Sequence, residues 1–390
     1  MGWFPTKLDS EESKWHFDIL ILLAVIGSSA TQKHMPAITA SAFGLFPRLL
    51  PAPETLLDTR RLYRLPSAQN VDVVGVHSGT VLTELNYFAN LLHKIEDIKP
   101  FEFRSCEIEY NFGDDREKAE PRKLRIKTTS FLNVVTILSI FMSVGLLVFA
   151  GVIHDGVALV GVGTMALSTS AASLSAWWSP KLPELPKRSV VTNLPAADVV
   201  IRTRGGGFIV VRANEKVIRE LYTGMDSCQY NLPDKARQVF LAMSTLLLMT
   251  SVIMFSNSSE KMQIAVGAAY FILNILYWGL ALLVESNDVW DTSRYKIDPK
   301  KTLKPTLAKS YTHVLWLAIS ETKSIDWVKR ANIAPKTAAW DQWLQEACEN
   351  ALRETKDWPA EQRKDEIIEE HLLKQQYQDR VLPQDQYLKV

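Results

Sequence analysis

The sequence predicts a mainly α-helical integral membrane protein with two antiparallel transmembrane hairpins, a candidate N-terminal span and small cytosolic α/β inserts. Two observations predict this fold class: four long stretches are almost free of charge, and basic residues flank them at alternating ends. The averages alone suggest a soluble protein, because the 390 residues carry 44 basic and 43 acidic side chains and are 47% hydrophobic. The same charge balance gives no support to a nucleic-acid partner, which needs a clustered basic excess.

The four apolar stretches are each long enough to cross a bilayer, which takes about 20 residues. They cover residues 131–154, 157–178, 239–256 and 264–284. Apolar core helices of soluble proteins are shorter, at about 10–14 residues. Four such stretches in one chain therefore argue for a membrane protein whose first partner is the lipid bilayer.

Short links join these stretches into two pairs. Residues 154–156 separate the first pair, and residues 257–263 separate the second. Links of this length make the paired helices antiparallel neighbours. The sequence therefore predicts one transmembrane hairpin at residues 131–178 and another at residues 238–285.

Basic residues set the predicted orientation, because they collect on the cytosolic side of membrane proteins. They precede the first and third stretches and follow the second and fourth, whereas the two links hold only Lys261 and His154. Both hairpins are thus predicted to enter from the cytosol and return to it, in a multi-pass protein of an endomembrane or the plasma membrane. Asn257, in the second link, begins an acceptor pattern for N-glycosylation, although its place against the bilayer leaves occupancy open.

The N-terminal segment, residues 1–52, leaves three alternatives open. Residues 17–30 contain an apolar run of about eleven residues, which is short for a span. This run can form a fifth span, it can lie on or re-enter the membrane with the mildly apolar residues 37–50, or it can be a cleaved signal peptide. Acidic residues before the run and basic residues before the first hairpin argue against the signal peptide.

Residue patterns predict a small α/β region at residues 53–130. Its expected elements are a strand at 71–76, a helix at 81–97 capped by Ser78-Gly79-Thr80, and paired strands at 101–112 and 123–129.

A second insert, residues 179–237, and the tail follow. In the insert we expect strands at 199–204 and 208–212 around a triple glycine, then a helix at 215–222 capped by Asn214. A phosphate loop is the alternative for the glycines, but it needs a helix directly after them, and here a strand follows. The tail, residues 286–390, is predicted to be helical at 305–323 and 338–353 and to end in a charged, solvated helix.

Polar residues inside the spans are expected to serve helix packing. Thr164, Ser168, Ala172 and Ala176 recur every four residues, which gives the small face that close packing in lipid requires. The fourth span adds three polar side chains for which packing is also the favoured role: Tyr270, Asn274 and Tyr277.

Candidate catalytic residues are few. None of the four spans has an ionisable residue in its interior, where one would mark a functional site. The spacing of the His and Cys residues fits no metal site, and no cofactor motif is evident, so neither a metal nor a cofactor is predicted. The weak candidates are Glu285, Asp288 and Asp291, which follow the fourth span. They can bind a cation, or they can pair with Arg294 and Lys296, and we favour the pairing.

Two segments resemble a group of fungal proteins. VVIRTRGGGFIVVRANEKVIRELY in the insert and KSIDWVKRANIAPKTAAWDQWLQEA in the tail are similar to segments of largely uncharacterised multi-span membrane proteins of filamentous ascomycete fungi. Some members are encoded in secondary-metabolite gene clusters. The resemblance implies a fungal integral membrane protein in such a metabolic context, and it carries no catalytic motif to transfer.

Three functions follow from these patterns. The first is a scaffold or accessory factor with most of its mass in the cytosol, whose partners would be other membrane proteins or pathway enzymes. The second is a membrane-bound enzyme of fungal secondary metabolism, for example a cyclase acting on a lipophilic intermediate. The third is an oligomeric transporter, although no inverted repeat or broken helix is evident. The first is the prediction that we favour.

Overall fold

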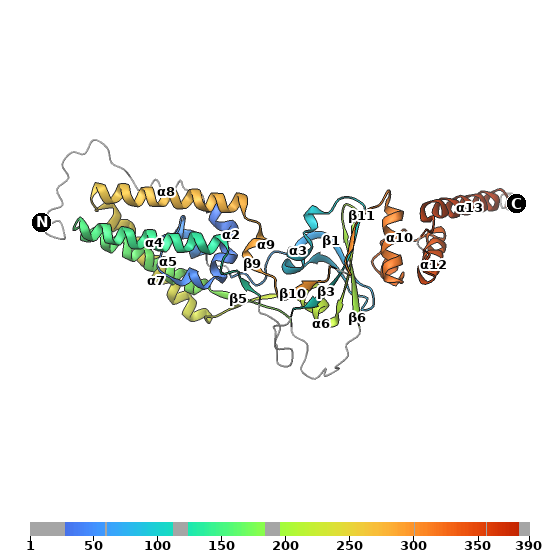
Figure 1. The fold of residues 1–390 in the computed structure, drawn as a ribbon, viewed down its shortest axis with the longest axis horizontal. Helices are drawn as coiled ribbons and strands as arrows, with labels where there is room; N and C mark the ends of the chain where they lie inside the picture. Colours follow the sequence, from blue (N-terminus) through green and yellow to red (C-terminus); the bar gives the residue numbers. More distant parts are fainter. Residues whose placement is uncertain are drawn as a thin grey trace, which may run out of the picture. The chain divides into compact units, whose positions relative to one another are not determined.

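The computed structural model describes residues 28–58, 61–111, 124–183, 196–299, 301–355 and 357–381. These residues divide into two units (Figure 1). The four-helix unit contains the described residues up to Leu65, from Leu124 to Lys181 and from Ser227 to Thr292. The α/β unit contains those from Pro66 to Asn111, from Leu182 to Asp226 and from Ser293 onward. The chain therefore alternates between the two units.

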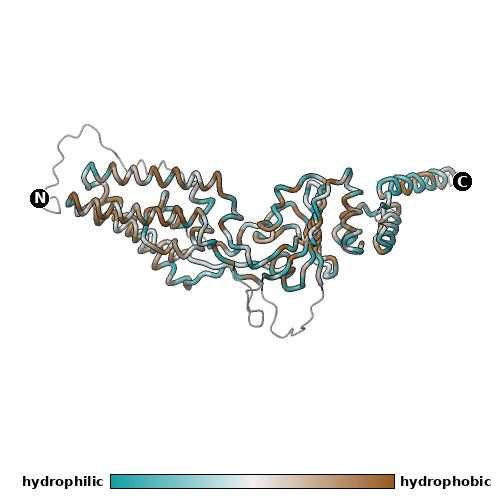
Figure 2. Tube along the Cα trace, viewed as in Figure 1, coloured by the Kyte–Doolittle hydropathy of each residue, from teal (hydrophilic) through white to brown (hydrophobic). Residues whose placement is uncertain are grey.

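Four helices of the first unit are long and apolar enough to span a membrane, as the sequence predicts. They are α4 (Phe131–Val152), α5 (Gly156–Ala176), α7 (Asp234–Ser256) and α8 (Glu260–Leu283), and Figure 2 shows their hydrophobic colouring. At the start of α4 the Ser130 hydroxyl accepts a hydrogen bond from the Asn133 N–H at 3.3 Å. At the start of α5 the Asp155 carboxylate accepts one from the Ala158 N–H at 2.9 Å. Such caps satisfy backbone donors that the first turn of a helix leaves open.

Small side chains bring α5 and α7 into the closest packing of this unit. Ser168 and Ala172, from the predicted small-residue face, are buried, and the Ser168 hydroxyl donates to the Ser244 carbonyl at 2.8 Å. A Cβ at Gly161 would lie 3.1 Å from the Phe255 ring. The second predicted pair differs from expectation, because α8 packs on α4 rather than closely on α7, although a short link joins α7 to α8.

A segment before the first long helix inserts into this bundle. It follows α2 (Ser28–Ala40) and contains the 3-10 turns η1 (Ala42–Leu45) and η2 (Pro53–Leu57). Between the turns, the buried Leu49 donates its N–H to the Ser143 hydroxyl at 2.8 Å and accepts at its carbonyl from the Ser139 hydroxyl. Because both serines lie inside α4, residues 41–57 enter the bundle, and we call them the inserted segment. The predicted apolar run at 17–30 lies almost entirely outside the described residues.

Two short strand pairs lie in the same unit. They are β4 (Arg125–Ile126) with β9 (Trp290–Asp291), which follows α9 (Ser286–Val289), and β5 (Trp178–Lys181) with β8 (Ser227–Tyr230). The rings of Trp178 and Trp290 connect the pairs, with centroids 5.9 Å apart. The pairing of β4 corrects the prediction that residues 123–129 pair with residues 101–112.

A seven-stranded mixed sheet forms the α/β unit. Its order is β10 (Tyr295–Ile297), β3 (Glu102–Tyr110), β7 (Phe208–Asn214), β6 (Ala196–Thr203), β1 (Ala68–Gly75) and β2 (Val81–Leu85), and β11 (Leu303–Leu307) also pairs with β3. Neighbours are antiparallel except β3 and β7, which are parallel. The sequence predicts two separate inserts and a helical tail, whereas strands from both inserts and from the tail join one sheet.

Local predictions in this unit are partly right. The β-hairpin of β6 and β7 is confirmed, with Gly206 at a φ of +79° in its turn. The helix predicted at 81–97 is wrong, because Val81–Leu85 pairs with β1 as β2. The helix α3 covers only Tyr87–His93, and the 3-10 turn η3 (Ile95–Asp97) follows it.

Helices from the tail pack beside the sheet. α10 (Tyr311–Thr322) packs on β3 and β7, and α12 (Ala338–Leu352) and α13 (Ala360–Val381) pack on α10, while the short α11 (Asp326–Arg330) follows α10. The helix predicted at 338–353 is confirmed, whereas the helix predicted at 305–323 begins only at Tyr311, because residues 303–307 form β11. Trp327 and Trp343 pack with Val200 and Phe208 of the sheet in one buried cluster. The helix α6 (Glu215–Ile218) and the π turn η4 (Arg219–Thr223) follow β7, and α6 packs on β6, β7 and β3.

Candidate functional site

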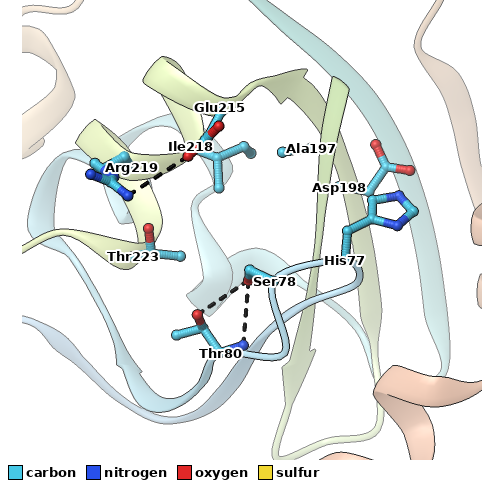
Figure 3. A pocket seen from close by; sticks show the side chains of 9 residues that line it. All are labelled: His77, Ser78, Thr80, Ala197, Asp198, Glu215, Ile218, Arg219 and Thr223. Atoms are coloured by element: carbon cyan, nitrogen blue, oxygen red, sulfur yellow. Dashed lines mark hydrogen bonds and ion pairs between the residues drawn. The ribbon is translucent and has the colours of Figure 1, made fainter. Parts of the chain in front are cut away.

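A pocket opens in the α/β unit where the β1–β2 turn approaches the start of β6 and the turns α6 and η4 (Figure 3). Its volume is about 480 Å³, which is in the range of small-molecule sites. Hydroxyl, imidazole, carboxylate and guanidinium groups line it together with two apolar side chains. The lining residues are His77, Ser78, Thr80, Ala197, Asp198, Glu215, Ile218, Arg219 and Thr223.

The β1–β2 turn places His77, Ser78 and Thr80 at the pocket. The Gly75 N–H donates to the Thr80 carbonyl at 2.9 Å, which closes the turn, and Gly79 takes a left-handed φ of +72° within it. The Ser78 hydroxyl folds back over Gly75, where a Cβ would lie only 2.1 Å from it. A side chain at position 75 would therefore displace the Ser78 hydroxyl from this place in the turn.

The opposite wall comes from α6 and η4. The Asn214 side chain accepts a hydrogen bond from the Val217 N–H at 2.9 Å, so it caps α6 as the sequence predicts. Glu215 and Arg219 form an ion pair one turn apart, at 3.7 Å. At this distance the pair is loose, and the partly exposed guanidinium of Arg219 can also meet an anionic group in the pocket.

Asp198 and His77 lie next to each other at one end of the pocket (Figure 3). Burial raises the pKa of the Asp198 carboxyl, Arg212 and His77 oppose the shift, and Glu321 adds to it. The net result is a carboxyl that holds its proton more readily than one in water does. A carboxyl of raised pKa next to an imidazole is a pair of groups that general acid–base chemistry can use.

Ser78 does not complete a nucleophilic triad with these two residues. Its hydroxyl lies 3.1 Å from the Thr80 hydroxyl and accepts from the Thr80 N–H at 3.3 Å, so it points away from the His77 ring (Figure 3). A nucleophilic serine needs a base within hydrogen-bond reach. The arrangement therefore suits ligand binding and proton exchange rather than acyl transfer.

The sequence-predicted acidic residues lie elsewhere, in the four-helix unit. Glu285 and Asp288 are exposed, and Asp291 lies in β9 opposite Arg125 of β4. Within the described ranges, no three His, Cys, Asp or Glu side chains come together in a way that could hold a metal ion. The catalytic role of Glu285, Asp288 and Asp291 stays a prediction.

Asn257 is exposed at the end of α7, where its side-chain amide donates to the Ile253 carbonyl at 2.8 Å. Its glycosylation stays a prediction too.

Sequence reasoning missed the residues that build the pocket. Asp198 and Arg219 are ordinary surface residues by sequence. They line one pocket with His77 only because β6, which precedes the turns that carry Arg219, pairs with β1. The run His77-Ser78-Gly79-Thr80 was the available signal for a turn here. Its residues are also typical of a helix cap, whereas in the structure they form the turn between β1 and β2. No protein-family model, curated protein or solved structure is detectably similar to this chain.

Proposed function

We propose that this protein is a membrane-anchored accessory protein whose α/β unit binds a small polar ligand on the cytosolic side. The observation that carries this proposal is the origin of the sheet. Its strands come from three chain segments, residues 68–110, 196–214 and 295–307, and two pairs of long apolar helices lie between them. Strands of one sheet must be on the same side of a bilayer. If the helices span, each pair therefore has to leave that side and return to it.

The surface of the four-helix unit supports insertion in a bilayer. Large apolar side chains are exposed along α4, including Phe131 at 66%, Phe141 at 69% and Val152 at 68%. Leu282 and Leu283 are exposed by 74% and 83% at the end of α8. Apolar exposure on this scale is unfavourable in water and favourable in lipid. The protein should resist extraction from membranes by alkaline carbonate, and release into the soluble fraction would contradict the anchoring.

Basic residues indicate which side carries the α/β unit. Lys127 precedes α4, Lys181 follows α5, and Lys235 and Arg237 lie in the first turn of α7. Protease added to sealed microsomes should digest the α/β unit and leave Lys261, at the start of α8 beside the α7–α8 link, protected until detergent is added. Protection of the α/β unit in sealed vesicles would contradict the orientation.

The pocket lining indicates the class of ligand. The charged groups of the lining are Arg219, which pairs loosely with Glu215, and Asp198 beside His77. Ser78, Thr80 and Thr223 add hydroxyl groups, so the pocket suits a hydroxylated molecule whose one acidic group meets Arg219. Shikimate, a hydroxylated carboxylate, and myo-inositol, a neutral polyol, are suitable probes for thermal unfolding. Shikimate should stabilise the protein more than inositol does.

Pocket variants make this test specific. Thr223→Trp fills the pocket and should abolish the shikimate effect, whereas Thr306→Ala, at an exposed threonine of β11, should leave it unchanged. Equal stabilisation of both variants would place binding outside the pocket.

A second candidate function is an acid–base enzyme, because Asp198 of raised pKa lies beside His77. Deletion of the protein in its host separates the two functions: an enzyme leaves its substrate to accumulate, whereas an accessory factor lowers flux without a new precursor. For an enzyme at this pocket, His77→Ala and Asp198→Asn should reproduce the deletion. For the sequence-predicted site, Glu285→Gln, Asp288→Asn and Asp291→Asn should do so instead.

A further inference from the structure

Arg48 is completely buried in the four-helix unit, at 0% exposure. It belongs to the inserted segment, and hydrogen bonds from α4 and α5 hold the main chain around it. Its own carbonyl accepts a hydrogen bond from the Thr169 hydroxyl of α5, and the next residue, Leu49, is bonded to two serines of α4. The Arg48 side chain therefore lies wholly among the helices of this unit.

The guanidinium of Arg48 is only partly satisfied. Its Nη1 donates to the Gly44 carbonyl. Its Nε and Nη2 have no hydrogen-bond partner among the described residues, and no carboxylate in those ranges forms an ion pair with it. The Nε–H and Nη2–H groups point in parallel from one edge of the guanidinium. This edge of an arginine side chain can bind a carboxylate or phosphate through two parallel hydrogen bonds.

One face of α8 adds further unsatisfied oxygens. Tyr270, Asn274 and Tyr277 follow one another at helical spacing and are buried. In the part of the chain that the structure describes, the two phenol oxygens and the Asn274 Oδ1 lack hydrogen-bond partners. Tyr277 lies against Arg48 and Thr136, yet its hydroxyl makes no hydrogen bond of normal geometry to either. A hydroxyl donor and a guanidinium edge are therefore adjacent, and both are available.

Packing alone accounts poorly for this arrangement. A buried charge is costly unless an opposite charge or a full set of hydrogen bonds compensates it, and inside a bilayer an ionisable group is a functional site by default. Gly44 leaves room for the nearby Ile38 carbonyl, from which a Cβ at this position would lie only 2.7 Å, whereas the same Cβ would be in ordinary contact with Nη2 of Arg48 at 3.7 Å. The bundle thus holds a cation that the described residues leave without an anion.

We propose that Arg48 and Tyr277 bind the oxyanion of an anionic amphiphile, a carboxylate or phosphate at the end of an apolar chain that comes from the bilayer. The Nε–H and Nη2–H of Arg48 donate two parallel hydrogen bonds to the oxyanion, and the Tyr277 hydroxyl donates a third. The apolar chain packs against the buried cluster around Leu49, which includes Leu146, Val266 and Leu273. The proposal rests on the insertion of the four helices in a membrane.

The test uses the full chain reconstituted into nanodiscs of neutral phosphatidylcholine. Labelled oleate and 1-oleoyl-lysophosphatidate present a carboxylate and a phosphate on the same chain, oleyl alcohol lacks the anion, and inorganic phosphate lacks the chain. Empty nanodiscs give the background of partitioning. We expect saturable binding of oleate or lysophosphatidate and none of oleyl alcohol or free phosphate. Oleyl alcohol binding as tightly as oleate, or phosphate as tightly as lysophosphatidate, would overturn the proposal.

Three variants separate binding from a purely structural role. Arg48→Lys keeps the charge but loses the two-pronged edge, and Tyr277→Phe keeps the ring but loses the hydroxyl. Each should weaken binding about tenfold or more. Ser168→Ala removes a buried hydrogen bond between α5 and α7, so it should lower stability and leave affinity unchanged. If the lysine variant does not fold, the milder Tyr277→Phe variant decides the matter.

The outcomes also separate this inference from the proposed function. Failure of the chain to insert into nanodiscs contradicts the membrane anchoring itself. Insertion with wild-type affinity in Tyr277→Phe and Arg48→Lys, or with no selective binding of either anionic probe, contradicts the amphiphile site and leaves the anchoring intact.

Discussion

One carboxylate, that of Asp155, joins the starts of two helices that are far apart in the sequence. It accepts a hydrogen bond from the Ala158 N–H at the start of α5, and another from the Ser259 N–H, 2.8 Å away, just before α8. The residue therefore connects the α4–α5 link with the α7–α8 link. This connection is made at the ends of the helices, where α7 and α8 themselves pack little.

Loss of these two hydrogen bonds should destabilise the four-helix unit. The cap of α5 contributes about 1 kcal/mol and the bond to Ser259 about as much, so Asp155→Ala should cost about 2 kcal/mol of unfolding free energy in detergent. Burial acts to raise the pKa of Asp155, but the N–H groups of Ala158 and Ser259 outweigh it and lower the pKa. Because the folded pKa is depressed, the contribution is present above the ordinary pKa of an aspartate and is lost as pH falls through the lower folded value. The acid sensitivity of thermal unfolding should be smaller in Asp155→Ala, and an unchanged profile would contradict this role.

His93 should make the α/β unit sensitive to mild acid. Burial, followed by the charge of Arg104, lowers its pKa from 6.5 to about 4, and its Nε2 lies 2.6 Å from the hydroxyl of the buried Tyr222. Above pH 6.5 both folded and unfolded chains hold a neutral imidazole. As pH falls from about 6.5 to 4, His93 binds a proton in the unfolded chain but stays neutral in the folded chain. Up to about 3 kcal/mol of stability is therefore lost.

Denaturant unfolding of the full chain at several pH values measures this effect. His93→Gln should remove most of the loss between pH 6.5 and 4, whereas His371→Gln, at a partly exposed histidine of α13, should not. Equal slopes for wild type and His93→Gln would show that the imidazole is protonated in the folded protein.

Gly75 and Ser78 should be coupled in stability. In Gly75→Ala the new Cβ meets the Ser78 hydroxyl at 2.1 Å, which should cost about 1–3 kcal/mol through distortion of the β1–β2 turn. Removal of the hydroxyl leaves the Ser78 Cβ at 3.4 Å as the nearest atom, so Gly75→Ala/Ser78→Ala should recover most of the loss. Gly205→Ala, where the nearest atom is 3.8 Å away, is the matched control. Additive effects in this double-mutant cycle would contradict the contact.

Gly161 should be required for the close packing of α5 and α7. A Cβ there would lie 3.1 Å from the Phe255 ring and 3.2 Å from Met254. Gly161→Ala should cost about 1 kcal/mol and Gly161→Leu about 3 kcal/mol in thermal unfolding. At Gly163, two residues away on α5, a Cβ would meet no atom of the described residues within 4 Å. Gly163→Leu should therefore be close to neutral, and equal losses at both positions would contradict this packing.

The sequence predicts the features of this protein that depend on local pattern. The long apolar helices, the β6–β7 hairpin and the cap at Asn214 are all encoded within about 25 consecutive residues. The helix predicted at 81–97 fails because Leu82, Leu85 and Phe88 recur at a helical spacing, while the pairing of Val81 with Val74 in β1 decides in favour of a strand. Tertiary pairing outweighs local preference there.

The sites depend on contacts between distant segments, and the sequence alone predicts neither of them. The pocket needs the pairing of β1 with β6, and the whole α4–α5 pair separates these two strands along the chain. Arg48 stands alone among apolar residues in the sequence, because its polar neighbours Tyr277 and Thr169 come from α8 and α5. The interiors of the four spans hold no ionisable residue, yet a charge reaches the interior of the bundle from a segment outside them.

The alternation of the chain between its two units has a consequence for biosynthesis. β3 lies between β7 and the pair β10 and β11, which are translated after it and on the far side of one or both pairs of apolar helices. An emerging chain therefore exposes the edges of β3 until the ribosome has completed α8 and passed residue 307. During this interval the half-made sheet needs protection by a chaperone, and a nascent chain stalled before β10 would present an open edge that quality control can recognise.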